Sequence, residues 1–416
     1  MYMIKNLYVP QQPKKEKIEY LNPTLMHFNC IQYSPVRLKV LTKTSSFKNI
    51  LSFNKYDELS SIDGPIIAIW EHLGETTNFL TDIYNNLKLT YPKNPIYLII
   101  DDMYEGLLTQ KVVDNLQKQL KLDGVAIVTS NYKLKGNNIF YINYHLYSAE
   151  FDNIDVGQFK FAFNTRLRNK KFICLNRQER LHRLLTIDYL IEKDYLKHTH
   201  ASCSNKEYKY ITKNADTYIN DMPLSEFAED RLYTSFDEVK NYHFSAEQQQ
   251  RLDTNLPVKL ENESFLLNPR VLPRADDYFY DSYWALCTER DFYKNDLYEG
   301  FTEKTVKCLL YGLPFIIIGL PNTLSKLRDL GFITFSNVID ESYDTIQNND
   351  KRFAAIKEQI DYLASLNYNE LNLLNLELQP ILEYNYKRFM QIHNSMPNVN
   401  FVNRLQSWLR NYHQSQ

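Results

Sequence analysis

Short apolar segments alternate with longer amphipathic segments along two stretches of this chain, and that alternation restricts its fold more than any other feature of the sequence. In the first stretch the apolar segments lie at 65–70, 95–100 and 124–130, and helix-length segments separate them at 76–89 and 109–122. Continuous apolar runs of this length are typical of strands buried on both faces, which occur in parallel sheets. The pattern therefore predicts βαβ units and a parallel sheet over about residues 1–160.

A second alternation begins with the apolar segment KKFICLN at 170–176, which a helix-length segment follows at 177–196. Residues 201–262 are polar and rich in tyrosine, and we interpret them as an insertion with short helices at 223–232 and 245–252. Beyond the insertion, strands are expected at 281–289, 314–319 and 332–335, and helices at 302–312 and 321–331. These elements predict a second α/β domain over 165–345.

The C-terminal segment, residues 350–416, is compatible with helix almost throughout, and Pro380 and Pro397 are expected to divide it. Two doubly wound domains followed by helices form a layout similar to that of the GT-B glycosyltransferases. Ligands of open parallel sheets bind beyond the carboxyl ends of the strands. Functional side chains are therefore expected where the apolar segments end.

Composition excludes several other classes of protein. Lys and Arg number 48 against 50 Asp and Glu, so the chain as a whole is not a basic coat for DNA or membranes. No apolar run approaches the roughly 18 residues that cross a bilayer, and the N-terminus lacks the layout of a signal peptide. The five cysteines show no CxxC spacing, which favours a reducing compartment. We therefore expect a cytoplasmic protein, in the host cytoplasm if a phage encodes it.

The segment 283–335 carries the strongest functional pattern. A predicted strand ends at Glu289, a polar loop follows, and a predicted helix then begins with Thr302 as its N-cap. The first turn of a helix presents free N–H groups and a positive dipole, which favour a phosphate. In that turn Lys304 would add a full charge, and Glu303 could accept hydrogen bonds from ribose hydroxyls. Thr302 and Glu289 are further candidates for binding the same ligand. An ordinary strand–helix–strand unit with surface residues at 303 and 304 is the alternative.

This segment resembles the donor-binding segment of the α1,3-fucosyltransferase family and of exostosin-like transferases, in which a strand ending in FEN precedes the pattern (D/F)xTEKxxxALxxGxxPxxxG. The counterparts here are CTER at 287–290, FTEK at 301–304, LYG at 310–312, Pro314 and Gly319, with Arg290 at the position of the asparagine. The resemblance implies a GT-B fold, with two Rossmann-like domains facing a central cleft. It also implies a nucleotide-sugar donor, with Glu303 on the ribose and Lys304 on the diphosphate, and no bound metal or cofactor.

A basic stretch at 164–183 follows the same logic. Arg177 and Arg180 lie just after the predicted strand ICLN, one turn apart, and arginine at such a position suits bidentate binding of phosphate. Pairing with Glu179 or with surface acids is the alternative. The string LNRxxRxHR also resembles the start of the donor domain in phage- and virus-encoded glycosyltransferase-like proteins.

An inverting transferase needs a general base near the acceptor hydroxyl. Glu71 and His72 follow the strand at 65–70 directly and are the first candidates, ahead of Glu75, Asp101 and Asp102, although acidic loop residues are common at such places. His198, His200 and Cys203 form a short cluster without a second ligand pair, so we expect an exposed loop there and no zinc site. Asp276, Asp277 and Asp281 lack the spacing of a DxD metal motif.

These observations predict a glycosyltransferase that moves a sugar from a nucleotide-diphosphate sugar to an acceptor hydroxyl. Ten glycines and 32 tyrosines are typical of AT-rich coding, as in many bacteriophages, so a hydroxylated base of phage DNA is one acceptor. A glycan or a protein hydroxyl is equally open. Two other hypotheses stay open as well. One is a non-catalytic binding or assembly protein on a GT-B scaffold, and the other is a GT-B epimerase that acts on the nucleotide sugar itself.

Overall fold

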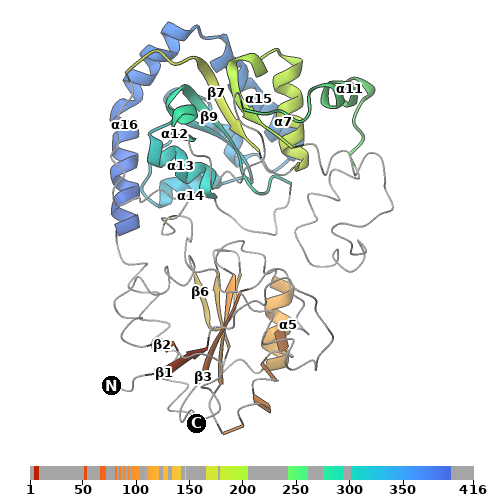
Figure 1. Ribbon diagram of the computed structural model, residues 1–416, viewed down its shortest axis with the longest axis vertical. Helices are drawn as coiled ribbons and strands as arrows, with labels where there is room; N and C mark the ends of the chain where they lie inside the picture. Colours follow the sequence, from red (N-terminus) through yellow and green to blue (C-terminus); the bar gives the residue numbers. More distant parts are fainter. Residues whose placement is uncertain are drawn as a thin grey trace. The chain divides into compact units, whose positions relative to one another are not determined.

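The chain forms two compact units, which the ribbon of the computed structural model draws in Figure 1. Unit 1 comprises Met1–Ser148, Asp296–Tyr298 and Ile392–Gln416, so it takes residues from both ends of the chain. Unit 2 comprises Ala149–Asn295 and Glu299–Gln391. The described residues are 4–8, 51–53, 66–71, parts of 80–146, 165–176, 179–204, 242–260, 275–293 and 301–394.

Unit 1 contains a parallel sheet, which in the described residues has six strands in the order β2-β1-β3-β4-β5-β6. The strands are β1 (Ile4–Tyr8), β2 (Leu51–Phe53), β3 (Ile66–Glu71), β4 (Ile96–Asp102), β5 (Val125–Thr129) and β6 (Ile139–Tyr141). The crossover from β4 to β5 contains helix α5 (Gln110–Leu120). Residues 80, 81, 84, 85, 88 and 89 are helical as well. The parallel sheet expected from the apolar alternation is confirmed.

Apolar spacing explains how α5 covers this sheet. Val112, Val113 and Leu116 are buried at intervals of one, three and four residues, which places them on one face of the helix. They pack in one cluster with strand residues that include Leu98 and Ile127. Burial of a side chain of this size stabilises the fold by roughly 1.5–3 kcal/mol. This stripe of aliphatic residues therefore holds α5 against the sheet.

Unit 2 contains a second parallel sheet, with four strands in the described residues and the order β10-β9-β7-β8. The strands are β7 (Lys170–Leu175), β8 (Thr199–Ser202), β9 (Ser282–Thr288) and β10 (Phe315–Ile318). The helices between them are α7 (Leu181–Glu192), α11 (Ala246–Asn255), α12 (Ala275–Tyr280) and α13 (Glu303–Tyr311), with the 3-10 turn η3 (Leu196–His198). After β10 come α14 (Thr323–Asp329), η5 (Glu341–Thr345), α15 (Asn349–Ser365) and α16 (Tyr368–Asn394). Parallel sheets with helical crossovers make the protein an α/β protein.

The strand expected at 332–335 is absent, and this prediction was wrong. The backbone of that segment bonds to side chains in place of a neighbouring strand. Asn385 of α16 accepts a hydrogen bond from the N–H of Ile333 at 2.8 Å and donates one to its carbonyl at 2.7 Å. Glu341 accepts the N–H of Phe335 at 2.6 Å. Because these partners satisfy the polar backbone, Phe332 and Phe335 are buried without joining the sheet, while Ile333 is exposed.

The prediction of an exposed loop at His198–Cys203 was also wrong. Residues 199–202 form β8, which pairs in parallel with β7, and Cys203 is buried. The short side chains at 201–204 give little apolar signal, which is why the sequence did not predict a strand. A strand placed beside β7 nevertheless gains the full ladder of backbone hydrogen bonds.

The C-terminal helices do not divide at Pro380, as was expected, and Pro397 lies outside the described residues. α16 continues through Pro380, and the break between α15 and α16 lies at residues 366–367. Asn367 accepts the N–H groups of Asn369 and Glu370, while the carboxylate of Glu370 accepts the N–H of Asn367 at 2.7 Å. This reciprocal cap starts a new helix. Pro380 lies on the exposed face of α16. Leu378 and Leu382, two residues before and after it, are buried and keep this part of the helix packed on the protein.

Arg352 of α15 is the largest fully buried charged side chain in the described part of unit 2. Its guanidinium donates to the carbonyls of Phe292, Gly319 and Ile346 at 2.5, 3.2 and 2.8 Å. It also lies over the ring of Phe292, with 4.3 Å from Cζ to the ring centroid. Burial lowers the pKa of Arg352 to about 10, so it is charged at neutral pH. One cation therefore joins the segments that follow β9 and β10 to the start of α15.

Replacement of this guanidinium should destabilise unit 2 strongly. We expect Arg352→Met to lower the free energy of unfolding by about 3 kcal/mol or more, because several buried carbonyls lose their donor at once. Arg388→Met is the matched control, since Arg388 donates to the single carbonyl of Leu330, and about 1 kcal/mol is expected there. Urea denaturation of both variants measures the difference. Equal losses would contradict the role assigned to Arg352.

No helix within the described ranges combines the length and the apolar character that crossing a membrane requires.

Candidate functional site

Glu289 directly follows β9 and lies at the start of the candidate site. All seven residues of β9 are buried, and Glu289 is only 2% exposed. Its Oε2 accepts hydrogen bonds from the N–H and the hydroxyl of Thr302, at 3.0 and 2.5 Å, and its Oε1 accepts one from the hydroxyl of Thr305 at 2.6 Å. Thr302 is the N-cap of α13, as the sequence predicted. The carboxylate of Glu289 therefore fixes the first turn of α13 to the end of β9.

The backbone of Glu289 makes equally specific contacts. Its carbonyl accepts hydrogen bonds from His182 Nε2 at 2.9 Å and from Arg183 Nη2 at 3.2 Å, both in the first turn of α7. Its N–H donates to the carbonyl of Ile318 at the end of β10, at 2.9 Å. The N-terminal turns of α7 and α13 thus converge on one residue at the carboxyl edge of the sheet.

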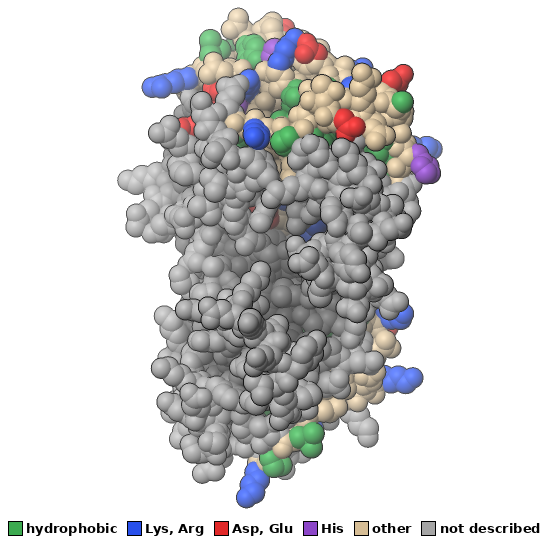
Figure 2. All heavy atoms as spheres, turned by 45° about the vertical axis from the view of Figure 1, so that its right-hand side comes forward, with side chains coloured by type: hydrophobic (Ala, Val, Ile, Leu, Met, Phe, Trp, Pro, Cys, Tyr) green, Lys and Arg blue, Asp and Glu red, His purple; other side chains and the backbone are tan. Residues whose placement is uncertain are grey.

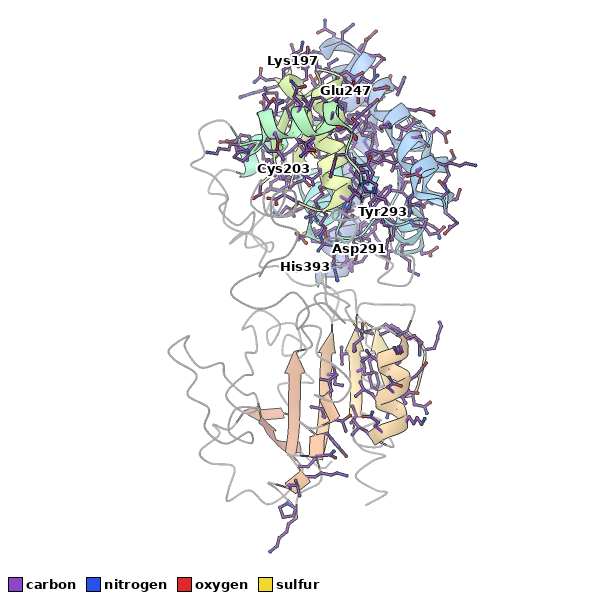
Figure 3. All side chains as sticks on the ribbon, turned by 90° about the vertical axis from the view of Figure 1, so that its right-hand side faces the viewer. Lys197, Cys203, Glu247, Asp291, Tyr293 and His393 are labelled. Carbon is purple, nitrogen blue, oxygen red and sulfur yellow. The ribbon has the colours of Figure 1, made fainter. Side chains whose placement is uncertain are left out.

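A second contact joins the neighbouring strand ends at the same edge. The hydroxyl of Thr288 donates to the side-chain oxygen of Asn176, the residue after β7. The N–H of Asn176 donates in turn to the carbonyl of Ser202 in β8, at 2.9 Å. In Figure 3, Asp291 and Tyr293, which follow β9, lie near one end of unit 2. Lys197, which precedes β8, lies near the opposite end.

Glu303 and Lys304 are the partly exposed members of this cluster. Their side chains are 23% and 22% exposed, and Lys304 Nζ lies 3.1 Å from Glu303 Oε1 and 3.5 Å from the Thr302 hydroxyl. Glu303 also acts electrostatically on Arg183, whose pKa it raises against the lowering by burial. The two predicted ligand-binding side chains are therefore in the first turn of α13, at its open end.

Arg180 makes contacts within unit 2, and its predicted binding of phosphate stays a prediction. It is the N-cap of α7 without a side-chain cap, and it is buried. Its guanidinium donates to the carbonyl of Arg290 and lies 3.2 Å from Asp291 Oδ1. The side chain of Arg180 consequently holds the loop after β9 against the start of α7. Arg290 is itself buried beside Asp291, with 3.4 Å between Nε and Oδ2.

His182 is neutral at physiological pH. Burial, followed by the charge of Arg183, lowers its pKa well below 6.5. Its Nε2 faces a carbonyl and therefore carries the proton, while Nδ1 has no hydrogen-bond partner in the described part of the chain. The ring stacks on Phe292, with 5.7 Å between centroids and 17° between planes. Burial, with Arg180 nearby, also lowers the pKa of Arg183, to about 10, so Arg183 is charged.

The sequence pattern did not single out four residues of this cluster, His182, Arg183, Asn176 and Thr305. His182 and Arg183 lie inside the basic string RLHR, but only their place in the first turn of α7 reveals that they bond to Glu289. Asn176 ends the apolar run KKFICLN, and a polar residue at a strand end was the one available signal. Thr305 gave no signal, because its importance depends on the orientation of Glu289.

Some of the other predicted site residues lie outside the described part of the chain. Arg177 and His72 fall outside the described residues, and Glu71 ends β3 with its side chain outside them. The pairing of β3 with β4 places the backbone of Glu71 opposite that of Asp101. Neighbouring strands are about 4.8 Å apart. Two of the acidic candidates are therefore neighbours at the carboxyl ends of adjacent strands in unit 1.

The histidines near β8 bind other partners. His198 Nδ1 lies 3.0 Å from the Tyr368 hydroxyl, and His200 Nε2 lies 3.0 Å from Asp281 Oδ2. Asp281 also accepts the amide of Asn169 at 2.8 Å. Among the residues that the structure describes, no three His, Cys, Asp or Glu side chains are grouped so that they could hold a metal ion. The side chain of Asp276 lies outside the described residues.

No model of a known protein family matches the chain, and no curated protein matches it.

The importance of Glu289 can be measured directly. Glu289→Gln keeps the size of the side chain but replaces one acceptor oxygen by a donor, so at least one threonine hydroxyl or N–H loses its partner. We expect the free energy of unfolding to fall by about 1.5–3 kcal/mol, the range for hydrogen bonds to a charged group. Hydrogen exchange at the first amides of α13 should accelerate. Glu341→Gln, which also removes a buried three-bond carboxylate, should leave exchange in α13 unchanged.

His182 should make stability depend on pH. Below pH 6.5 the unfolded chain binds a proton at this position and the folded chain does not, so the free energy of unfolding decreases as pH falls. Between pH 7 and pH 5.5, wild type should lose about 1 kcal/mol more than His182→Gln, whose amide can still donate to Glu289. Urea midpoints at the two pH values measure this. His243→Gln at an exposed position controls for the loss of an imidazole. Parallel curves for wild type and His182→Gln would contradict the assignment.

Proposed function

We propose that the protein is a glycosyltransferase of two Rossmann-like domains, the GT-B type, which transfers a sugar from a nucleotide-diphosphate sugar to an acceptor hydroxyl. Unit 2 binds the donor in this proposal, and unit 1 binds the acceptor. The observation that carries it is the convergence of the first turns of α7 and α13 on Glu289, at the carboxyl edge of a parallel sheet. Ligands of such sheets bind at that edge.

The donor's diphosphate fits the chemistry of α13. Each helix N-terminus presents N–H groups and a partial positive charge, and two of them converge here. Lys304 adds a full charge that is partly exposed, and Glu303 beside it can accept hydrogen bonds from ribose hydroxyls. Arg183, charged and buried behind them, strengthens the positive potential without needing to contact the ligand.

The transfer step moves one proton from the acceptor hydroxyl to a base and releases one leaving group, the nucleoside diphosphate. A general base takes the proton of the acceptor hydroxyl, the oxygen attacks the anomeric carbon, and the bond from that carbon to the diphosphate breaks. Glu71 and His72 are the bases we propose, with Asp101 in the strand beside Glu71 as a further candidate. The leaving diphosphate would receive its stabilisation from Lys304 and the helix dipoles, without a bound metal or another cofactor. A hydroxylated DNA base, a glycan and a protein hydroxyl all supply the required nucleophile.

A second candidate function has its own support. Glu289, Arg180 and Arg290 are buried and engaged in contacts within unit 2, as expected of residues that hold a scaffold together. A binding or assembly protein that kept this scaffold without catalysis would need no more. On the face of unit 2 drawn in Figure 2, basic and acidic side chains are interspersed.

Donor binding can be tested with Lys304→Ala. A panel of nucleoside diphosphates and nucleotide sugars should include at least one that raises the melting temperature of wild type. Loss of one charge-assisted contact of about 1.5–3 kcal/mol should weaken its binding roughly 10- to 100-fold in the variant. Lys351→Ala is the matched control, because Lys351 follows Asp350 in the first turn of α15 as Lys304 follows Glu303 in α13. No stabilisation by any compound, or equal binding by both variants, would remove the proposal.

A bound donor without transfer would favour the second function. Wild type that binds a nucleotide sugar and releases no free nucleoside diphosphate, with hydroxylated DNA, glycan and protein acceptors each supplied, would be a binding protein.

A further inference from the structure

Two buried cysteines lie in contact between β9 and α13, which pack side by side in unit 2 (Figure 1). Cys287 is the last residue but one of β9, and Cys308 lies one helical turn after Lys304 in α13. Their Sγ atoms are 3.4 Å apart. The thiol of Cys308 also donates to the carbonyl of Lys304, at 3.3 Å. This pair of thiols is therefore next to the first turn of α13, two residues before Glu289.

The contact distance brings the two thiols close to the geometry of a disulfide. An S–S bond is about 2.05 Å long, so the two sulfur atoms need to approach by about 1.4 Å. Rotation about the Cα–Cβ bond moves a cysteine sulfur by such an amount without moving the backbone. Cys174 in β7 is placed differently, because its sulfur accepts a hydrogen bond from the Asn176 amide at 3.4 Å. Cys174 is therefore a matched control for the pair.

Burial decides which oxidant reaches the two thiols. Cys287 is 3% exposed and Cys308 is 1% exposed, so a bulky reagent such as oxidised glutathione has no access in the folded protein. Burial, followed by the hydrogen bond with Cys308, also raises the pKa of Cys287 well above 9. Because the thiolate is the reactive form, oxidation near neutral pH is slow. Hydrogen peroxide is close to water in size and can enter through small local openings.

We propose that Cys287 and Cys308 form a reversible oxidation site, at which hydrogen peroxide joins β9 to α13 through a disulfide. In the reduced protein, hydrogen bonds to Glu289 hold the first turn of α13 to the end of β9. The disulfide adds a covalent bond between the same two elements. The site does not depend on the proposed sugar transfer, since its formation and its effect are measured on the protein alone.

The oxidation has two steps. Peroxide first oxidises one thiol to a sulfenic acid, and one molecule of water leaves. The neighbouring thiol then attacks the sulfenic sulfur, the S–S bond forms, and a second molecule of water leaves. Two thiols and one hydrogen peroxide thus give one disulfide and two molecules of water, and the peroxide oxygens take up the two electrons. Because the second thiol is already in contact, it reacts before another peroxide can oxidise the sulfenic acid further.

Mass spectrometry of tryptic peptides tests this inference. The native full-length protein is treated with excess hydrogen peroxide, its remaining thiols are blocked with iodoacetamide in denaturant, and the chain is digested. Peptides 275–290 and 308–326 each contain one cysteine of the pair and no other. We expect these peptides to be joined, at a mass two hydrogen atoms below their sum, and to separate on addition of dithiothreitol.

The effect on the fold is measured in the same samples. The disulfide closes a loop of about 20 residues and should raise the melting temperature by about 5–10 °C. Hydrogen exchange in α13 should slow. Cys308→Ser should show neither effect, and its Cys287, which then has no neighbouring thiol, should pass to the sulfinic acid if it reacts at all. Cys174→Ser should behave as wild type does.

Several results would overturn the inference. One is a wild-type protein whose two thiols stay free, or become sulfinic acids, under prolonged peroxide treatment. Another is a joined pair that changes neither the melting temperature nor exchange in α13. Equally fast joining by oxidised glutathione would show that only the unfolded chain reacts, with the same consequence. The peptide result for wild type decides the inference even where a serine variant does not fold.

Discussion

The carboxylate and the carbonyl of Glu289 together are the contact on which the arrangement of unit 2 depends. Through them the end of β9 holds the first turns of two helices that lie more than a hundred residues apart in sequence. The carboxylate has all its oxygens engaged within the protein, so it can be buried as a charge. Its removal would release α13 from the sheet edge and would leave Lys304 and Glu303 without a fixed direction. What a ligand meets at this edge is decided by a residue that the ligand need not touch.

Arg352 holds the loop that follows β9 through a second set of contacts. Its guanidinium donates to the carbonyl of Phe292, and Phe292 stacks on His182. The loop after β9 is thus held between a cation of α15 and the first turn of α7. Because an arginine carries five donors in a rigid plane, one side chain can satisfy carbonyls from several segments. The partly exposed pair Glu303–Lys304 rests on this internally bonded framework.

The sequence predicted those parts of the fold whose signal is local. Buried parallel strands are continuous apolar runs, so β4, β5, β7, β9 and β10 could be located within one or two residues. The start of α13 was predictable because Thr302 is a good N-cap. The segment at 332–335 and the strand β8 could not be predicted, since their backbone partners are distant, Asn385 and Glu341 in one case and β7 in the other. For the site, residue types indicated Glu289 and Arg180, but only the packing shows that both face inward.

The composition of unit 1 has a consequence for how the chain is made. Its residues include Ile392–Gln416, whereas every residue of unit 2 precedes them. Domains form during synthesis as their residues leave the ribosome, usually from the N-terminus onward. In this chain the last residues of unit 1 are synthesised after the last residue of unit 2. Unit 2 can therefore be completed before unit 1, although unit 1 contains the N-terminus.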